Sequence, residues 1–171
     1  MINKNIQTAV NHQIKEELYS SYLYLSMAGY ATEMNLKGFA NWFTVQAKEE
    51  LDHAMGFFNY LLSRGGKVEL LEIPKPPSVF KNPKSLFNEA LKHEQFITGK
   101  INLLYELSCE EKDYSFQSFL KWYIDEQVEE ESNATEMIEK MRMVGENEAT
   151  LLFIDSQLAT RVYTPTLPTT K

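Results

Sequence analysis

Cysteine is nearly absent from this chain of 171 residues, which contains only Cys109. A single cysteine cannot form an intramolecular disulfide, so the composition excludes a small secreted scaffold held by disulfides and suits a reducing, cytoplasmic environment. Long apolar runs are missing as well, because the longest are only a few residues, such as Leu151 to Ile154. A bilayer-spanning helix needs roughly 20 apolar residues, and we therefore expect no association with a membrane.

Basic residues are in the minority, with 17 Lys and Arg against 24 Asp and Glu and a formal net charge of -7. This balance disfavours nucleic acid as a partner and concentrates cations near the surface. The first residues lack a basic head followed by an apolar segment, so no secretion signal is expected. Hydrophobic residues make up 43% of the chain and charged residues 24%, which is typical of a globular domain rather than a disordered or fibrous chain.

Proline is absent from most of the chain, and the proline-free stretches repeat apolar residues at helical spacing. Gly65 follows one such stretch, as glycine does beyond a helix C-terminus, whereas Asn82 (with a proline after it) and Asp113 are residues that begin helices. Residues 67–81 contain three prolines and should be extended. The pattern predicts four long helices and a shorter amphipathic one, over residues 6–33, 39–64, 82–111, 114–144 and 147–160.

The links between these segments predict the topology. Each long helix has about 28 residues and should be on the order of 42 Å long, while the short breaks join antiparallel neighbours. The extended link has about 17 residues and, at roughly 3.3 Å each, reaches along the whole bundle. We therefore predict an all-α four-helix bundle made of two antiparallel hairpins and one long crossover. Residues 1–160 should form this single domain, and residues 161–171 a flexible C-terminal tail.

Glu50 and His53 form a Glu-x-x-His pair, in which two side chains three residues apart share one helix face. Such a pair alone is a weak signal, because Glu and His often lie three apart by chance. The signal becomes strong when the two hairpins are overlaid, since polar residues recur 77 positions later. This single offset pairs three residues of the first hairpin with three of the second: Glu17 with Glu94, Glu50 with Gln127, and His53 with Glu130.

This layout is that of a di-iron carboxylate bundle, whose four helices all send ligands inward. Carboxylates with one imidazole suit iron(II), whereas cysteine-rich sites suit zinc or an iron–sulfur cluster. Glu17 adjoins Leu18 and Glu94 precedes Phe96, so neither lies in a purely charged stripe, and a buried carboxylate requires a compensating cation. The alternative is that these glutamates face water or pair with nearby lysines, and six positions in register across four helices argue against it.

Two longer stretches carry a resemblance to a known family. Residues 13–25 read QIKEELYSSYLYL, and residues 125–131 read DEQVEEE. Both are similar to the first- and fourth-helix signatures of non-haem ferritins of the prokaryotic type, and the resemblance extends to about residue 160. It implies the ferritin-like fold with a short fifth C-terminal helix and two adjoining iron sites bridged by Glu50. The implied ligands are Glu17, Glu50 and His53 at site A, and Glu50, Glu94 and Glu130 at site B.

The resemblance also assigns roles to residues around these sites. Gln127 matches a hydrogen-bonding residue beside the bridge, and Tyr24, two turns from Glu17, matches a tyrosine next to the site. A third iron site toward the cavity would use Glu49, Glu126 and Glu129. The implied protein is a ferroxidase that oxidises iron(II) with oxygen or hydrogen peroxide. It would store the ferric oxyhydroxide inside a homo-oligomeric cage of 24 subunits.

Departures from symmetry separate this chain from related classes. Bacterioferritins and rubrerythrin-like oxidases resemble one another in a second Glu-x-x-His on the fourth helix, where this chain has Gln127 and Glu130. Leu51 stands where the haem methionine of bacterioferritin would fall, so we expect no haem. Two rivals stay open: a di-iron oxidase or peroxidase whose metals remain bound, and a helical scaffold without metal. A mini-ferritin of the DNA-protecting kind fits less well, because its metal site lies between subunits.

The last predicted helix is too apolar to stand free in water, since it contains Leu151, Leu152, Phe153, Ile154 and Leu158. Four long helices already close one core, so we expect this helix to remain outside that core and to mark an interface. The resemblance implies that it meets its symmetry mates around a fourfold axis of the cage.

Overall fold

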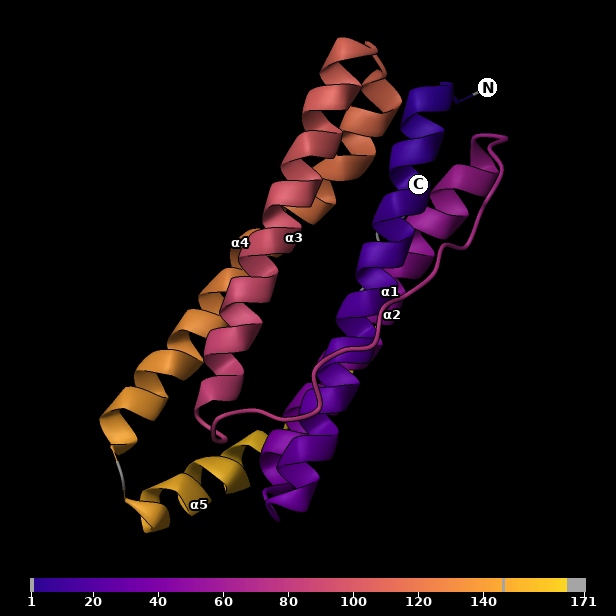
Figure 1. The fold of residues 1–171 in the computed structure, drawn as a ribbon. Coiled ribbons are helices and arrows are strands. Elements are labelled where there is room, and N and C mark those ends of the chain that lie inside the picture. The colour runs from indigo at the N-terminus through magenta and orange to yellow at the C-terminus, as the bar shows by residue number, and fades with distance from the viewer. Residues whose placement is uncertain (1, 146, 166–171) are drawn as a thin grey trace.

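The computed structural model describes residues 2–145 and 147–165, and within them it contains five helices and no strands. Four long helices lie side by side, and a shorter fifth helix crosses one end of them (Figure 1). The helices are α1 (Lys4–Glu33), α2 (Lys37–Ser63), α3 (Ser85–Glu110), α4 (Tyr114–Val144) and α5 (Glu148–Leu158). The predicted all-α four-helix bundle is confirmed. No helix in the described part of the chain combines the length and apolarity that crossing a bilayer requires.

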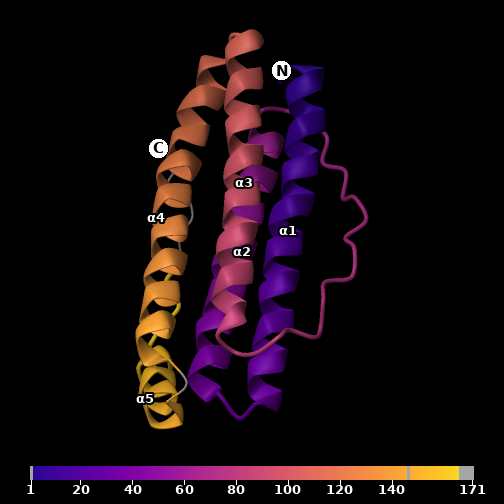
Figure 2. The same ribbon diagram turned by 60° about the vertical axis from the view of Figure 1, so that its left-hand side comes forward.

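The crossover between the two hairpins runs along α1 from one end of the bundle to the other, as the views in Figure 1 and Figure 2 both show. Side chains of α1 form hydrogen bonds with the backbone of the crossover. Asn11 donates to the carbonyl of Lys67 at 3.0 Å and accepts from the amide of Glu69 at 2.9 Å, and Ser26 donates to the carbonyl of Pro77 at 2.6 Å. The predicted connectivity of two antiparallel hairpins and one crossover is therefore confirmed.

Three helices end with the same backbone conformation. Asn35, Gly65 and Lys112 follow α1, α2 and α3 with φ angles of 59, 69 and 53°, in the left-handed region. In each case the next residue donates its amide hydrogen to a carbonyl five positions earlier, as Gly66 does to Leu61 at 2.9 Å. This pairing satisfies carbonyls that the helix leaves open and turns the chain sharply.

The predicted helix starts are present, with one shift. Asp113 accepts the amide hydrogen of Phe116 at 3.0 Å and caps α4 as expected. Asn82 accepts the amide hydrogen of Ser85 at 2.8 Å, but the turn that follows is not α-helical, so α3 begins at Ser85 rather than beside Asn82. Asp113 also forms an ion pair with Arg64 at 2.9 Å, which ties the end of α2 to the start of α4.

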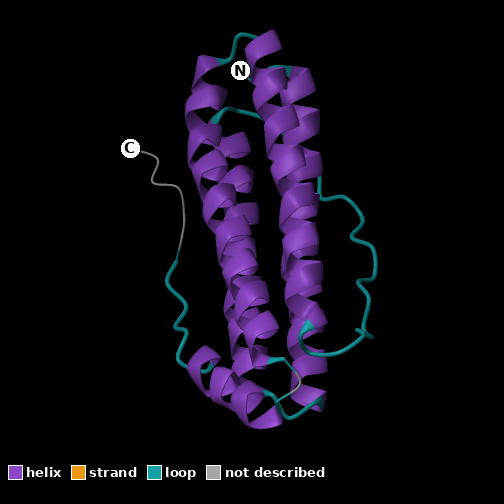
Figure 3. Cartoon of the chain, turned by 90° about the vertical axis from the view of Figure 1, so that its left-hand side faces the viewer, coloured by secondary structure: helices purple, strands orange, loops and turns teal. Residues whose placement is uncertain are grey.

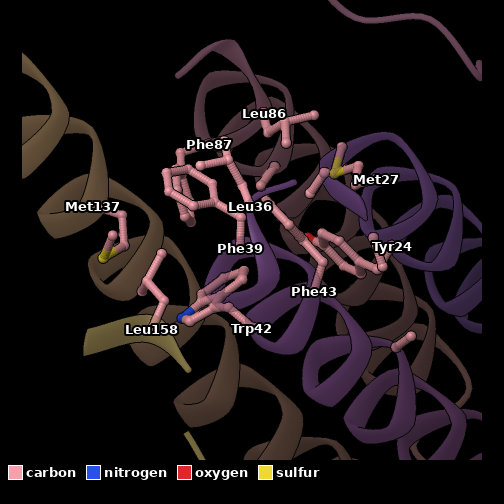
Figure 4. Close-up of a cluster of buried hydrophobic side chains, with 14 of the residues drawn as sticks. Tyr24, Met27, Leu36, Phe39, Trp42, Phe43, Leu86, Phe87, Met137 and Leu158 are labelled. Atoms are coloured by element: carbon pink, nitrogen blue, oxygen red, sulfur yellow. The ribbon is translucent and has the colours of Figure 1, made fainter. Parts of the chain in front are cut away.

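Two apolar clusters fill the two halves of the bundle. One lies toward α1's N-terminus and is built around Ile14, Phe57 and Tyr123. The other lies toward α5 and is built around Phe43 and other aromatic residues of α2 and α3 (Figure 4). Between these clusters, along every long helix, is a short section whose buried residues are polar. This section positions the site described below.

The fifth helix packs on its own bundle, contrary to the expectation that it remains outside the core. Ile154 and Leu158 are buried in the apolar cluster beside α5. The side chain of Asp155 accepts the amide hydrogens of Gly38 and Phe39 at 2.8 and 3.0 Å, and so supplies the cap that α2 lacks. The approach requires glycine, because a Cβ on Gly38 would lie 1.6 Å from the carbonyl oxygen of Asp155.

Candidate metal centre

The four long helices bring six polar side chains together between the two apolar clusters. All are at most 6% exposed, although buried carboxylates are rare without partners. The 3.6-residue period directs each side chain inward, because apolar residues one turn away on the same face belong to the core. The six are Glu17 from α1, Glu50 and His53 from α2, Glu94 from α3, and Gln127 and Glu130 from α4.

The ligand atoms of these residues are close enough for one ion to contact several of them. Glu17, Glu50 and His53 each offer an atom within 4.8 Å of the others, and so do His53, Glu126 and Glu130. The two nitrogens of His53 face different carboxylates, with Nδ1 at 3.4 Å from Glu50 and Nε2 at 3.9 Å from Glu126. His53 therefore lies where the two groups meet.

Unsatisfied atoms show what this site is suited to hold. Among the described residues, two buried side-chain atoms have no hydrogen-bond partner, and they are Oε2 of Glu17 and Nε2 of His53. Leaving such atoms unpaired is costly, so native proteins rarely do it without a functional reason. A carboxylate oxygen and an imidazole nitrogen are both donors for iron(II), and a bound cation would satisfy them.

Neutral donors hold the carboxylates in place. Gln13 donates to Glu17 at 2.8 Å, and Gln46 donates to Glu50 at 3.0 Å. The overlay of the two hairpins does not identify either glutamine, although each lies one helical turn before a candidate ligand, in the pattern Gln-x-x-x-Glu. That spacing was the available signal, because side chains four apart meet on one helix face.

Glu94 receives two donors from other helices. Gln127 donates to it at 3.2 Å, and the hydroxyl of the buried Tyr24 donates to its other oxygen. Gln127 therefore lies in the site as expected, but its hydrogen bond reaches Glu94, while Gln46 serves the predicted bridge Glu50. Tyr24 lies against the site and stacks on Phe43 at 6.1 Å between ring centroids.

Burial and mutual repulsion raise the pKa of most of these carboxyl groups. Burial and the neighbouring Glu50 raise the pKa of Glu17 to about 7 and that of Glu130 to about 8, and they raise the pKa of Glu94 well above its usual value. Burial alone would lower the pKa of His53, but the charge of Glu50 outweighs it and raises the pKa to about 10. The metal-free site therefore keeps protons that a bound cation would displace.

These shifts predict that the metal-free protein loses stability as the pH rises from 5.5 to 9. Glu17 and Glu130 bind protons more tightly when folded, so their contribution falls from pH 4.5 through about 7 and about 8, respectively. The ion pair of His53 with Glu50 is fully present below pH 6.5 and is lost as the pH rises through about 10. All three contributions have the same sign. The pKa of Glu50 is lowered from 4.5, so its own contribution is complete above that pH.

Calorimetry of chelator-treated protein measures this effect as a melting temperature that falls across the range. Zinc(II) should reverse the fall, because a cation replaces the displaced protons. The matched variant is Glu17→Gln, which keeps the volume, removes one titrating group and should flatten the slope. A melting temperature that stays constant or rises with pH contradicts the assignment of these charges.

The three residues expected to form a third site are placed unequally. Glu126 joins His53 and Glu130 in the second group of ligand atoms. Glu49 forms an ion pair with Arg161 at 2.5 Å, and Glu129 is exposed and belongs to no ligand group within the described residues. Of the three residues, Glu126 therefore lies at the centre, and Glu49 is paired with the guanidinium of Arg161.

The predicted C-terminal tail begins with residues that contact the bundle. Arg161 and Tyr163 reach α2, and Tyr163 donates to Asp52 at 2.6 Å. Residues 166–171, the rest of the predicted tail, lie outside the described residues. Contacts with the bundle therefore do not stop at the predicted boundary, residue 160.

Comparison with known proteins gives consistent matches. A family model described as Ferritin-like domain matches residues 7–144. Two curated proteins named bacterial non-heme ferritin are similar over almost the whole chain. The protein from Staphylococcus haemolyticus is 36% identical over 163 residues, covering 95% of this chain and 98% of the relative. The protein from Bacteroides fragilis is 37% identical over 161 residues, covering 94% and 100%.

Solved structures of Archaeoglobus fulgidus ferritin are similar in both fold and sequence. A form engineered to be closed by site-directed mutagenesis superposes with a TM-score of 0.95 at 45% identity, covering 96% of this chain and 100% of that one. The open-pore ferritin of the same archaeon superposes with a TM-score of 0.93 at 44% identity, covering 95% and 100%. The likeness therefore extends from the bundle to α5.

Proposed function

The chain belongs to the ferritin family, and from that membership we propose that it stores iron. It oxidises iron(II) at the buried centre and keeps the ferric product as a mineral inside a multi-subunit shell. The observation that carries this proposal is the pair of unsatisfied buried atoms, Oε2 of Glu17 and Nε2 of His53. Within the described residues, Glu17, Glu50, Glu94 and Glu130 form no ion pair with a lysine or arginine, so the site is suited to cationic iron as its substrate.

The residues fall into two sets of proposed ligands. Glu17, Glu50 and His53 bind one iron, and Glu50, Glu94 and Glu130 bind the other, with Glu50 between them. Each iron(II) gives up one electron, so a pair supplies the two electrons that, with two protons, convert oxygen to hydrogen peroxide. The chain's own contribution is to hold two like-charged ions side by side with carboxylates, which lower their repulsion.

Tyr24 and the outer carboxylates have supporting roles in this proposal. The hydroxyl of Tyr24 donates to Glu94 and thereby orients it toward the second iron. Glu126 shares a ligand group with His53 and Glu130, which supports its assignment to a third iron site with Glu49 and Glu129. Carboxylates at this position give the oxidised ion a place to move on its way out of the pair.

The shell is proposed to contain 24 copies of the chain and to lie in the cytoplasm, with no haem. Large apolar side chains on the outside of α1 and α2 support an assembly, because single soluble chains rarely leave so many exposed. They include Tyr22, Leu25, Leu51, Met55 and Leu62. The single cysteine supports a reducing compartment.

The test is to add iron(II) in air to metal-free protein and to measure how much iron stays with the particle. We expect retention of many times more iron than the buried ligands can coordinate, measured by size-exclusion chromatography with iron analysis. Retention of only a few ions per subunit would support the rival di-iron oxidase, whose metals are a fixed cofactor. No retained iron would favour a helical scaffold and would overturn the proposal.

A further inference from the structure

The chain reverses after α5 and returns along the bundle, as Figure 3 shows. Three of its residues dock on α2 through separate contacts. Asn41 donates to the carbonyls of Ala159 and Arg161 at 3.4 and 2.9 Å, and Tyr163 donates to Asp52 at 2.6 Å. This C-terminal segment, residues 159–163, therefore has a defined place beside the metal centre.

Arg161 makes the most extensive contacts of this segment. Its guanidinium lies 4.5 Å from the centroid of the Trp42 ring and donates to the Trp42 carbonyl at 3.3 Å. It also donates to Gln46 at 3.0 Å and to Glu49 at 2.5 Å. Both charged side chains of this ion pair are mostly withdrawn from solvent, with 23% of Arg161 and 12% of Glu49 exposed. Removing one partner of such a pair leaves the other charge withdrawn from water and uncompensated.

The partners of Arg161 connect it to the metal centre. Gln46 accepts from Arg161 with its oxygen and donates with its nitrogen to Glu50, the proposed bridging ligand. Glu49 lies near enough to Glu126 and His53 to interact with both electrostatically. The guanidinium is thus the cation paired with one of the outer carboxylates, Glu49.

We propose that Arg161 competes with iron for Glu49, so that the third ion binds only when the guanidinium is displaced. The inference rests on the proposed function and adds to it a built-in competitor supplied by the C-terminal segment. Arg161 is a positioning residue, because it touches a ligand rather than the reacting ions. Its fixed charge neutralises Glu49 while no ion is bound and weakens the hold on an ion that leaves the pair.

The displaced side chain has space nearby. A cavity of about 310 Å³ lies between α2, α4 and α5, and Arg161 is part of its lining. Glu136 also lines this cavity, where it forms an ion pair with Lys140 at 2.5 Å, so a guanidinium that leaves Glu49 would share this carboxylate with Lys140. Two positions with an acidic partner in each make displacement possible without unfolding of the segment.

The test measures anaerobic binding of zinc(II) alone to full-length, metal-free protein by calorimetric titration. Arg161→Met keeps the hydrocarbon stem over Trp42 and removes the charge. We expect the third zinc(II) ion to bind roughly tenfold tighter in this variant, while the first two bind as before. Arg161→Lys, which retains the charge, should stay close to the unaltered protein. Arg142→Met removes an exposed arginine of α4 and is the matched control.

Two further variants make the result decisive. Adding Glu49→Gln to Arg161→Met should abolish the gain, because the freed ligand is then missing. Tyr163→Phe loosens the segment but keeps the guanidinium, and should change the third affinity much less. The proposal is overturned if Arg161→Met binds no third zinc(II) ion or binds it no tighter than the unaltered protein. It is also overturned if the gain in third-ion affinity survives without Glu49, or if Tyr163→Phe gives an equal gain. Because zinc(II) is not oxidised, these outcomes are independent of whether the protein stores iron.

Discussion

Replacing His53 by alanine is expected to slow the oxidation of iron(II) about a hundredfold or more. His53 is the one nitrogen donor among the proposed ligands, and it belongs to both groups of ligand atoms found within the described residues. Its removal leaves carboxyl groups whose pKa is already raised by burial and by mutual repulsion, so they retain protons instead of binding an ion. Glu17→Ala should have a comparable effect, because it removes the other ligand whose buried atom has no partner.

Stopped-flow absorbance of the ferric product measures the initial rate in both variants. His12→Ala is the matched control, since His12 is an exposed histidine of α1. Helical content and particle size should be unchanged, because the apolar clusters on either side of the centre keep the bundle closed. Initial rates equal to those of the unaltered protein in both variants would disprove the assignment of the site.

A second measurement separates loss of a ligand from loss of structure. Glu17→Gln removes a buried charge without removing volume, so the metal-free protein should become more stable at pH 8 even as oxidation fails. A variant that was merely misfolded would lose both. A gain in stability together with a loss of oxidation rate is therefore expected if Glu17 serves function at a cost to the stability of the fold.

The features that could be predicted from the sequence are those that repeat along the chain or depend on residues close together in the sequence. The helices follow from apolar spacing, and the crossover follows from its prolines and length. The six central residues could be identified because the two hairpins repeat one pattern 77 positions apart, from Glu17 to Glu94 and from His53 to Glu130. A charged residue at a position that the apolar pattern places inside the bundle indicates a chemical role.

The parts that could not be predicted depend on contacts between distant residues. Gln46 carries no charge, so nothing in its own position distinguishes it from a surface amide until Glu50 is seen beside it. Arg161 pairs with a residue 112 positions away, from a stretch that is predicted to be a flexible tail. The docking of α5 depends on Gly38, which reads as part of a helix break until Asp155 is placed against it.

Deleting everything after Gly145 is expected to leave a folded bundle that binds two irons but assembles poorly. All proposed ligands precede the cut, so the centre should survive. Three contributions are lost with α5: the cap that Asp155 provides for α2, the burial of Ile154 and Leu158, and the pairing of Arg161. Uncapping a helix costs about 1 kcal/mol, and loss of the two apolar side chains costs a few more, so the subunit is weakened rather than unfolded.

Point variants separate the role of α5 within the subunit from its role between subunits. Leu152 and Phe153 are 61% and 60% exposed, on the side of α5 that its own bundle does not cover. Changing both to serine should leave the subunit's melting unchanged and destabilise the particle, because only a neighbouring copy would bury them. Asp155→Asn should do the reverse, since it weakens the cap on α2 and leaves that apolar face intact.

Sedimentation velocity on the truncated protein and on both point variants, before and after iron loading, decides between these roles. If α5 forms an interface, the truncated protein and the double serine variant sediment as small species that lose iron, while Asp155→Asn still forms particles. Val162→Ser is the control for removing an exposed apolar side chain beyond α5. A full-sized, iron-filled particle from the truncated chain would show that assembly depends on the faces of α1 and α2 alone. The exposed pair on α5 would then need another explanation, because a chain that covers Ile154 and Leu158 by itself gains nothing from leaving Leu152 and Phe153 in water.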